Sequence, residues 1–407
     1  MQRYFFYSIK KHNLNTYSFF LFHLQQKKIR MTYARVRLYL GLCNTLLFVL
    51  LSMVLLLPHT SEFLRELKLS DGCLLVYYIL FYLLISLPFD IYGGLVIPKK
   101  YAKHQINYAV YFLKWLRTSI IQSSFMWGLG MTFIFLSTFN VLLISSLVLI
   151  TAFILLEYQG FFTALISGFK ITKDSSLEPH LKLYGLKNYP IYLAENNDLS
   201  FAGGWCGLLG KKKLIIPKFW KEQLSEIGLM VQIARRVGAL ETNTRVRGIL
   251  VALICLLLNT FIGLWFIDFK FDDAVSVVQF SAVNTVLCFI NLLILPFLSR
   301  PAVIESDLFA LEQGFDYEDI KETIEFLDVV QDDELCRSTF VEMFFHPTPC
   351  ATSRLWYLHL KKPIKQKGGW QTVSNLLYLS SINLSLLPKA TNANVGRIDL
   401  YVMHPSD

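Results

Sequence analysis

Long apolar runs separated by polar segments set the pattern of this chain. A helix of about twenty apolar residues crosses the hydrocarbon core of a bilayer, so each run of that length predicts a membrane span. Four runs predict one span each: Leu38–Leu57, Cys73–Ile97, Ile249–Ile267 and Ser276–Leu298. The run Ser119–Glu157 is too long for one span, and polar residues around Asn140 divide it into a hairpin of two. The pattern therefore predicts about six spans and a mainly α, polytopic membrane protein.

Short patterns in the polar segments predict a small α+β domain. Two stretches are typical of short strands, Tyr189–Leu193 and Lys213–Ile216. Ser225 is a good helix N-cap followed by an acid, and it predicts a helix that reaches at least Ala239. Two further helices are predicted after the last span, Glu305–Gln313 and Tyr317–Val329.

The chain divides into six parts on this pattern. A basic N-terminal tail, 1–37, precedes a membrane region of four spans, 38–157. The segments 168–247 and 299–360 are the two halves of the α+β domain, which is split around the last two spans, 249–298. The segment 361–407 is a C-terminal extension that we expect to be poorly ordered.

Composition and charge agree with a membrane location and predict an orientation. Hydrophobic residues make up 54% of the chain, charged residues only 17%, and the mean hydropathy is +0.44. Basic residues fill the N-terminal tail and the loop Pro98–Arg117, whereas the loop Asp268–Ala274 is acidic. The positive-inside rule therefore predicts that both termini and the α+β domain are cytoplasmic. Because the basic residues flank apolar spans, the net charge of +9 favours membrane lipid as a partner and disfavours nucleic acid.

The spacing of histidines and cysteines argues against a metal site. Two imidazoles four residues apart on a helix share a face and can bind one zinc ion. No two of the eight histidines have this spacing: His12, His23, His59, His104, His180, His346, His359 and His404. The seven cysteines form no Cys-x-x-Cys pair, and four lie in apolar runs, so they are expected to be small buried hydrophobic residues.

Three blocks of residues occur in order between positions 75 and 357. The first is Leu87–Gly94 (LPFDIYGG), followed by Leu113–Leu116 (LKWL). The second runs from Ser200–Gly204 (SFAGG) to Leu214–Pro217 (LIIP). The third contains Ser299-Arg300, Asp307–Ala310, His346-Pro347-Thr348 and Arg354. In order and spacing the blocks resemble the CAAX prenyl endopeptidase family, a group of integral-membrane zinc metalloproteases.

The resemblance implies a catalytic site whose residues this chain lacks. The His-Glu-x-x-His motif of the family falls on Arg235, Arg236 and Ala239, and its third ligand, a Glu, falls on Val303. A catalytic zinc site needs about three protein ligands, and guanidinium groups repel a dication. Other residues that the resemblance assigns to the cleft are present, and Asp307 matches an Asp that helps to orient the metal site in the family. The candidate cleft residues are Phe201, Gly203, Gly204, Asp307, His346 and Arg354.

Two of these positions have competing interpretations. Arg235 and Arg236 are expected on a helix that faces the helix of Glu305 and Asp307, so a buried arginine–carboxylate pair can join the helices where zinc does so in active relatives. The alternative is that the arginines point to water or to lipid headgroups. His346 is either a hydrogen-bonded residue in a His-Pro turn or a residue that contacts a bound ligand.

The expected function is that of a catalytically inactive membrane metalloprotease-like protein, a pseudoprotease with no cofactor and with a scaffold or a peptide- or partner-binding role. Extended peptides can add to a strand edge without zinc. One alternative is an active membrane zinc endopeptidase with non-standard ligands such as His180, His346 and Glu305. Another is a transporter or lipid-handling protein, which is disfavoured because the predicted span interiors contain Asn and Gln but no charge.

Overall fold

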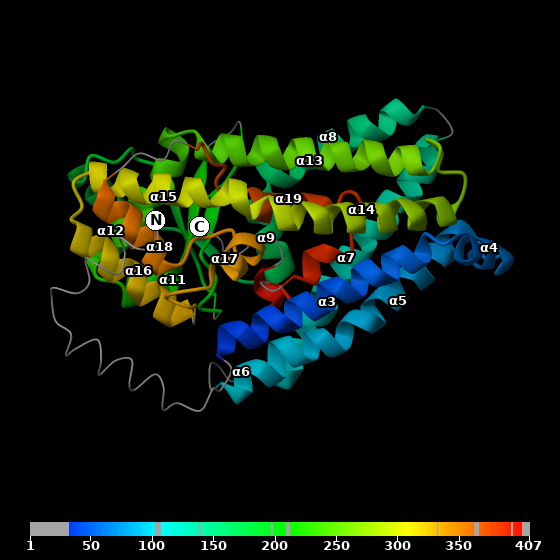
Figure 1. Cartoon of the computed structure of the whole chain (residues 1–407), viewed down its shortest axis with the longest axis horizontal. Helices are drawn as coiled ribbons and strands as arrows, with labels where there is room; N and C mark the ends of the chain where they lie inside the picture. The colour runs from blue at the N-terminus through cyan, green and yellow to red at the C-terminus, as the bar shows by residue number, and fades with distance from the viewer. Residues whose placement is uncertain are drawn as a thin grey trace.

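The structure is a computed structural model, and it describes residues 32–101, 107–137, 140–196, 198–208, 212–331, 333–361, 366–391 and 394–400 (Figure 1). Most of the basic N-terminal tail lies outside these residues, as do His12, His23, His104 and His404. The described chain forms a bundle of long helices with a smaller α+β domain at one end (Figure 1).

Five helices of the described chain are long and apolar enough to cross a membrane. They are α3 (Tyr33–Leu55), α5 (Asp71–Ile91) with its continuation through the π-helical turn η2 (Tyr92–Val96) and α6 (Ile97–Lys100), α7 (Tyr108–Ser137), α13 (Thr244–Phe266) and α14 (Ala274–Ile294). A pair bent by 75°, α8 (Val141–Glu157) and α9 (Gln159–Ser167), gives a sixth if it counts as one span. A short helix, α4 (Pro58–Glu66), follows α3. The prediction of a mainly α protein with about six spans is confirmed.

A four-stranded mixed sheet forms the β part of the smaller domain. Its order is β1 (Ile171–Lys173), β2 (Ile191–Ala194), β4 (Lys213–Pro217) and β3 (Gly204–Cys206). β2 and β4 pair in parallel, and both edge strands are antiparallel to their neighbours. The two strands that the sequence predicted are β2 and β4, whereas the three-residue edge strands were too short to leave a pattern.

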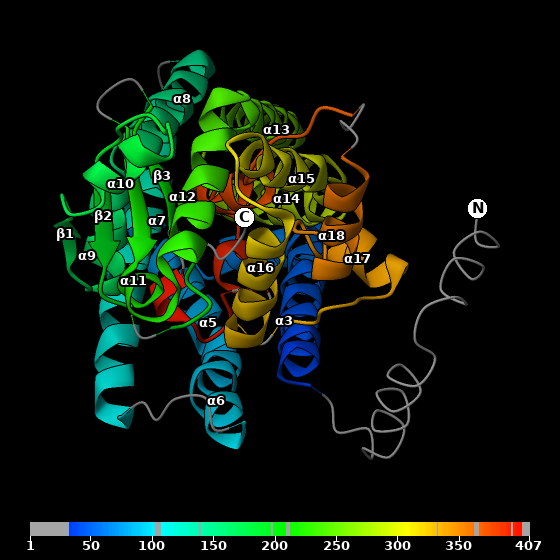
Figure 2. The same cartoon turned by 90° about the vertical axis from the view of Figure 1, so that its left-hand side faces the viewer.

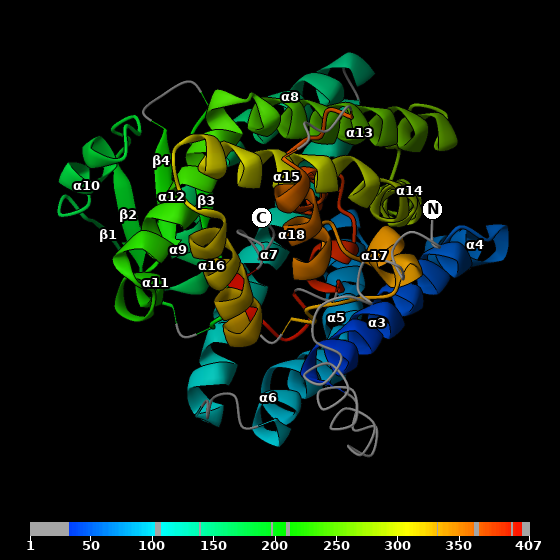
Figure 3. The ribbon, with the colours of Figure 1, turned by 60° about the vertical axis from the view of Figure 1, so that its left-hand side comes forward.

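Helices of the first half lie beside the sheet, and helices of the second half pack against the last of them on its side away from the sheet (Figure 2). The first half supplies α10 (Glu178–Leu183), α11 (Lys218–Gln223) and α12 (Glu226–Glu241). The second half supplies α15 (Pro296–Glu312), α16 (Tyr317–Gln331), α17 (Thr339–Phe345) and α18 (Ala351–Leu360). The Ser225 hydroxyl accepts a hydrogen bond from Gly228 N–H, as expected of the N-cap of α12. α12 packs against α15 and α16, so the two halves share one apolar core (Figure 3).

The C-terminal segment inserts among the membrane helices, and the expectation of a poorly ordered extension is wrong for its described residues. It contains α19 (Thr372–Ser380) and two short 3₁₀ turns, η3 (Leu387–Lys389) and η4 (Ile398–Leu400). Leu376, Leu387 and Ala390 are fully buried in the core of the bundle, and Figure 1 shows this red segment between the spans. Its polar residues hydrogen-bond to side chains and backbone of the spans, so a polar composition did not indicate exposure.

The expectation that the interiors of the spans contain no charge is also wrong. Arg37 of α3, Asp90 of α5 and Lys389 of η3 are all buried. The Asp90 carboxylate accepts hydrogen bonds from Gly396 N–H at 3.0 Å and from the Trp115 indole at 2.9 Å. The inserted C-terminal segment therefore supplies part of the polar environment that this buried carboxylate requires.

Candidate functional site

Asp307 lies at the centre of a buried charge cluster that joins three helices of the domain. Its carboxylate is fully buried on α15. Oδ1 lies 2.5 Å from Arg235 Nε of α12, and Oδ2 lies 2.8 Å from Arg354 Nε of α18. Arg354 Nη2 donates a second hydrogen bond to Oδ1 at 2.9 Å. One carboxylate thus binds two guanidinium groups in a dry environment, where charge-assisted hydrogen bonds are strongest.

Gln232 extends the cluster along α12. Its Oε1 accepts hydrogen bonds from Arg235 Nη1 at 2.7 Å and from Arg236 Nη1 at 2.9 Å. The guanidinium of Arg236 lies over the Trp220 ring, 4.4 Å from its centroid, and Nη2 donates to Ala202 O at 3.0 Å. The sequence analysis missed Gln232, although its position three and four residues before the two arginines places all three on one stretch of helix.

The Gly-rich segment predicted as one wall of the cleft is folded into the sheet. Phe201 is fully buried and packs against Phe169, and Gly204 begins β3. Gly203 has a φ of +70°, and a Cβ there would lie 2.1 Å from Ile215 O, so only glycine fits. Arg245 donates to Gly207 O at 2.8 Å, and Arg236 donates to Ala202 O. Arginines therefore bind main-chain carbonyls just before and just after β3 in the sequence.

The residues at the expected metal position do not fit a zinc ion. Arg235 and Ala239 are one turn apart on α12, Val303 and Asp307 are one turn apart on α15, and the Arg235–Asp307 contact shows that these two faces meet. The alternative that the arginines point to water is wrong because both are buried. Among the described residues, no group of three or more His, Cys, Asp or Glu side chains is placed to hold a metal ion.

The alternative ligand set is not assembled either. His180 of α10 contacts Glu226 at the start of α12, with Nε2 and Oε1 3.2 Å apart. Glu305 of α15 binds Arg247 of α13, with Oε2 3.0 Å from Nη2. Each of these groups has a different partner, so the structure does not bring them together with His346 to hold zinc.

His346 follows α17 and lies beside the ion pair of Asp333 and Arg337. Burial and the nearby Arg337 lower the pKa of this imidazole to about 4, against a smaller opposing effect of Asp333. The ring is therefore neutral at pH 7 and can act as a hydrogen-bond donor or acceptor. No pattern in the sequence indicated that Asp333 and Arg337 would lie beside it.

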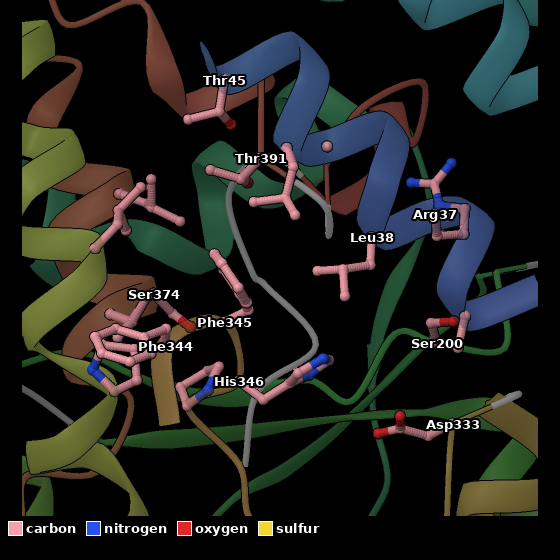
Figure 4. Close-up of a pocket in the computed structure, with 18 of the residues that line it drawn as sticks. Arg37, Leu38, Thr45, Ser200, Asp333, Phe344, Phe345, His346, Ser374 and Thr391 are labelled. Atoms are coloured by element: carbon pink, nitrogen blue, oxygen red, sulfur yellow. The ribbon is translucent and has the colours of Figure 1, made fainter. Parts of the chain in front are cut away.

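A cavity of about 240 Å³ lies between the bundle and the domain, and His346 is on its wall (Figure 4). Residues of α3, α14 and α19 and the segment around His346 line it. Of the candidate cleft residues, His346 lines this cavity, and so does Ser200, the neighbour of Phe201 in the sequence. Asp307 and Arg354 instead belong to the buried charge cluster. The structure thus separates the expected cleft into a closed charge cluster and an open cavity.

The fold and this site define a class of protein, a polytopic α-helical membrane protein with an α+β domain split around its last two spans. The fold is similar to that of the crystal structure of S. mikatae Ste24p, with a TM-score of 0.60 over 70% of this chain and 75% of that chain. The sequence identity is 14%, so the likeness is one of fold. No protein-family profile matches the sequence, and no curated protein matches it. The chain is an integral membrane protein of Ste24-like fold.

Proposed function

We propose that this chain is a catalytically inactive metalloprotease-like membrane protein with a scaffold or a peptide- or partner-binding role. The observation that carries the proposal is the Arg235–Asp307–Arg354 cluster. It occupies the position where the family resemblance places the catalytic metal, and its two cations disfavour a divalent ion there. The same contacts join α12, α15 and α18 without a metal.

An exposed edge of the sheet supports a binding role. The exposed β1 strand forms one edge of the sheet and can pair with an extended segment of a partner through main-chain hydrogen bonds. The proposal includes membrane lipid as surroundings, a peptide or membrane protein as partner, and no nucleic acid. From the distribution of basic residues we also propose that both termini are cytoplasmic.

The deciding experiment is to count zinc per chain in the purified protein, beside a variant that restores the implied ligands. In this variant Arg235→His, Arg236→Glu, Ala239→His and Val303→Glu are combined. We expect no stoichiometric zinc in the natural chain and about one zinc in the restored variant, because the four positions lie on facing helices. Stoichiometric zinc together with chelator-sensitive proteolysis by the natural chain would refute the proposal.

A further inference from the structure

The cavity beside His346 has one apolar side and one cationic side. Phe289, Leu292 and Leu293 of α14 and Leu377 of α19 form apolar parts of the wall. Arg37 and Arg397 line the cavity as well, together with Ser200 and Thr391. Figure 4 shows Arg37 and Leu38 of α3 across the cavity from Phe344 and Phe345. Such a cavity suits a ligand with an apolar body and a polar, negatively charged end.

The cationic side is held by contacts that fix both arginines. Arg37 is buried and donates to Gly93 O at 2.8 Å. Arg397 Nη2 donates to the Tyr33 hydroxyl at 2.9 Å, and its Nε lies 3.4 Å from Asp198 Oδ2. Among the described residues that line the cavity, the charged ones besides His346 are Arg37, Arg397 and Asp333. Asp333 is paired with Arg337, and Arg397 is paired with Asp198, so Arg37 leaves the balance positive. With His346 neutral, the wall favours an anion over a cation.

The Thr391 hydroxyl points to the same conclusion from a separate observation. Its oxygen is buried and has no hydrogen-bond partner in the described chain, although the residue lines the cavity. A buried hydroxyl without a partner is unfavourable, and it would donate a hydrogen bond to a carboxylate or phosphate oxygen in the cavity. This donor comes from the C-terminal segment, whereas Arg37 comes from the first described span.

α17 has side chains on the outer surface of the molecule and side chains on the cavity wall. The helix packs on α14 and α15 where the last span ends, and Arg300 Nη2 donates to Met343 O. Phe340 is 64% exposed and Met343 41% exposed, while the neighbouring Phe344 and Phe345 line the cavity. Exposed aromatic and apolar side chains at the end of a span are typical of residues at the headgroup level of a bilayer. One short helix thus separates the surrounding lipid from the cavity.

We propose that this cavity binds a single-chain anionic amphiphile drawn from the bilayer past α17, with its headgroup between Arg37, Arg397 and Thr391. A volume of about 240 Å³ is below the range of roughly 300–1,000 Å³ that holds drug-sized ligands, which favours one acyl chain over a two-chain lipid. The proposal goes beyond the function proposed above and is independent of whether the chain has lost proteolysis.

The test uses the full chain in nanodiscs of neutral phosphatidylcholine with a diazirine-bearing fatty acid as the probe. Photolysis followed by peptide mapping reports where the probe binds, and competition reports its chemistry. We expect labelling of α3 and α17 that unlabelled oleate displaces and oleyl alcohol, its uncharged analogue, does not. Equal displacement by the alcohol would overturn the role of the anionic headgroup.

Two variants change the site from opposite sides. Arg397→Gln removes a cation, and Leu42→Trp places a larger side chain into the cavity from α3. Each is expected to lower labelling about tenfold. Arg35→Gln is the control. It also removes a cation, and Arg35 lies on α3 like Leu42, but Arg35 binds Glu334 at 2.7 Å and does not line the cavity. Unchanged labelling in Leu42→Trp, with a melting temperature equal to that of the natural chain, would show that the probe binds elsewhere and would overturn the proposal.

Discussion

Arg235 and Asp307 meet at 2.5 Å in the interior of the domain, 72 positions apart in the chain. The contact joins the helix before the last two spans to the helix after them, so it connects the two halves of the split domain. Arg354 binds the same carboxylate from a third helix. A buried ion pair of this kind is a weak source of net stability, but removing one partner leaves an uncompensated charge. This asymmetry makes the cluster testable.

We expect Asp307→Ala to lower the free energy of unfolding by about 3–5 kcal/mol, because it leaves two buried guanidiniums without their carboxylate. The matched control is Glu305→Ala on the same helix. Its partner Arg247 and Glu305 itself are both partly exposed, so the expected loss is about 0–1 kcal/mol. Thermal unfolding in detergent measures both variants. Equal melting temperatures for the two variants would contradict the buried role of Asp307.

A chelator is expected to leave the melting temperature of the natural chain unchanged, since guanidinium contacts rather than a metal join α12 to α15. The variant with Arg235→His, Arg236→Glu, Ala239→His and Val303→Glu serves as the positive control. If it binds zinc, a chelator should lower its melting temperature, because a ligand that binds only the folded state stabilises that state. A chelator-sensitive natural chain would mean that a metal site exists elsewhere.

Stability is expected to fall as the pH is lowered from about 6.5 to about 4. The pKa of His346 is about 4 in the folded chain and near 6.5 when the residue is solvated, so between these values the unfolded state binds the proton and the folded state does not. Burial raises the pKa of Asp333, but the charge and hydrogen bond of Arg337 lower it by more, so the net shift is downward and its contribution to stability is lost at more acidic pH. His346→Gln should flatten the pH dependence of unfolding above pH 4, and an unchanged pH dependence in this variant would contradict the role of His346.

Asn383 of the C-terminal segment should contribute strongly to the stability of the helix bundle. Its Nδ2 donates to Asn284 Oδ1 at 3.0 Å and to Leu256 O at 3.1 Å, and its Oδ1 accepts from the Thr260 hydroxyl at 3.0 Å. Asn383→Ala is expected to cost about 1–2 kcal/mol of stability, since it removes hydrogen bonds to two spans and takes from the buried Asn284 Oδ1 its donor. Ser381→Ala is the control because that hydroxyl donates only within its own helical turn, to Tyr378 O.

Gly248 of α13 should not tolerate alanine. A Cβ at this position would lie 2.1 Å from Trp370 O, where the C-terminal segment crosses the helix. The backbone would have to shift, and we expect a loss of about 1–3 kcal/mol. Gly128 of α7 has no atom within 4 Å of such a Cβ, so Gly128→Ala is expected to be neutral or stabilising by up to about 1 kcal/mol. Urea or thermal unfolding of the pair separates a steric effect from helix propensity.

The sequence predicted the features that depend on local pattern. Apolar runs identified the spans, and Ser225 identified the start of α12. The Arg235–carboxylate pair was one of two interpretations of the arginines, and the 2.5 Å contact with Asp307 confirms it. The sequence did not predict the burial of α19 and of the described residues after it, because polar side chains inside a bundle have the same composition as exposed ones until their partners are known. Asp333 and Arg337 were missed beside His346 for the same reason, since only tertiary packing brings this ion pair next to the imidazole.

The inserted C-terminal segment also bears on biogenesis. Every span precedes residues 372–400 in the chain, so the spans are translated and delivered to the bilayer before their interior partner leaves the ribosome. Until then Thr260 and Asn284 lack the Asn383 side chain, and Asp90 lacks the Gly396 amide. The bundle is therefore completed after insertion of the last span, and an interrupted nascent chain would expose polar groups that membrane quality control can recognise.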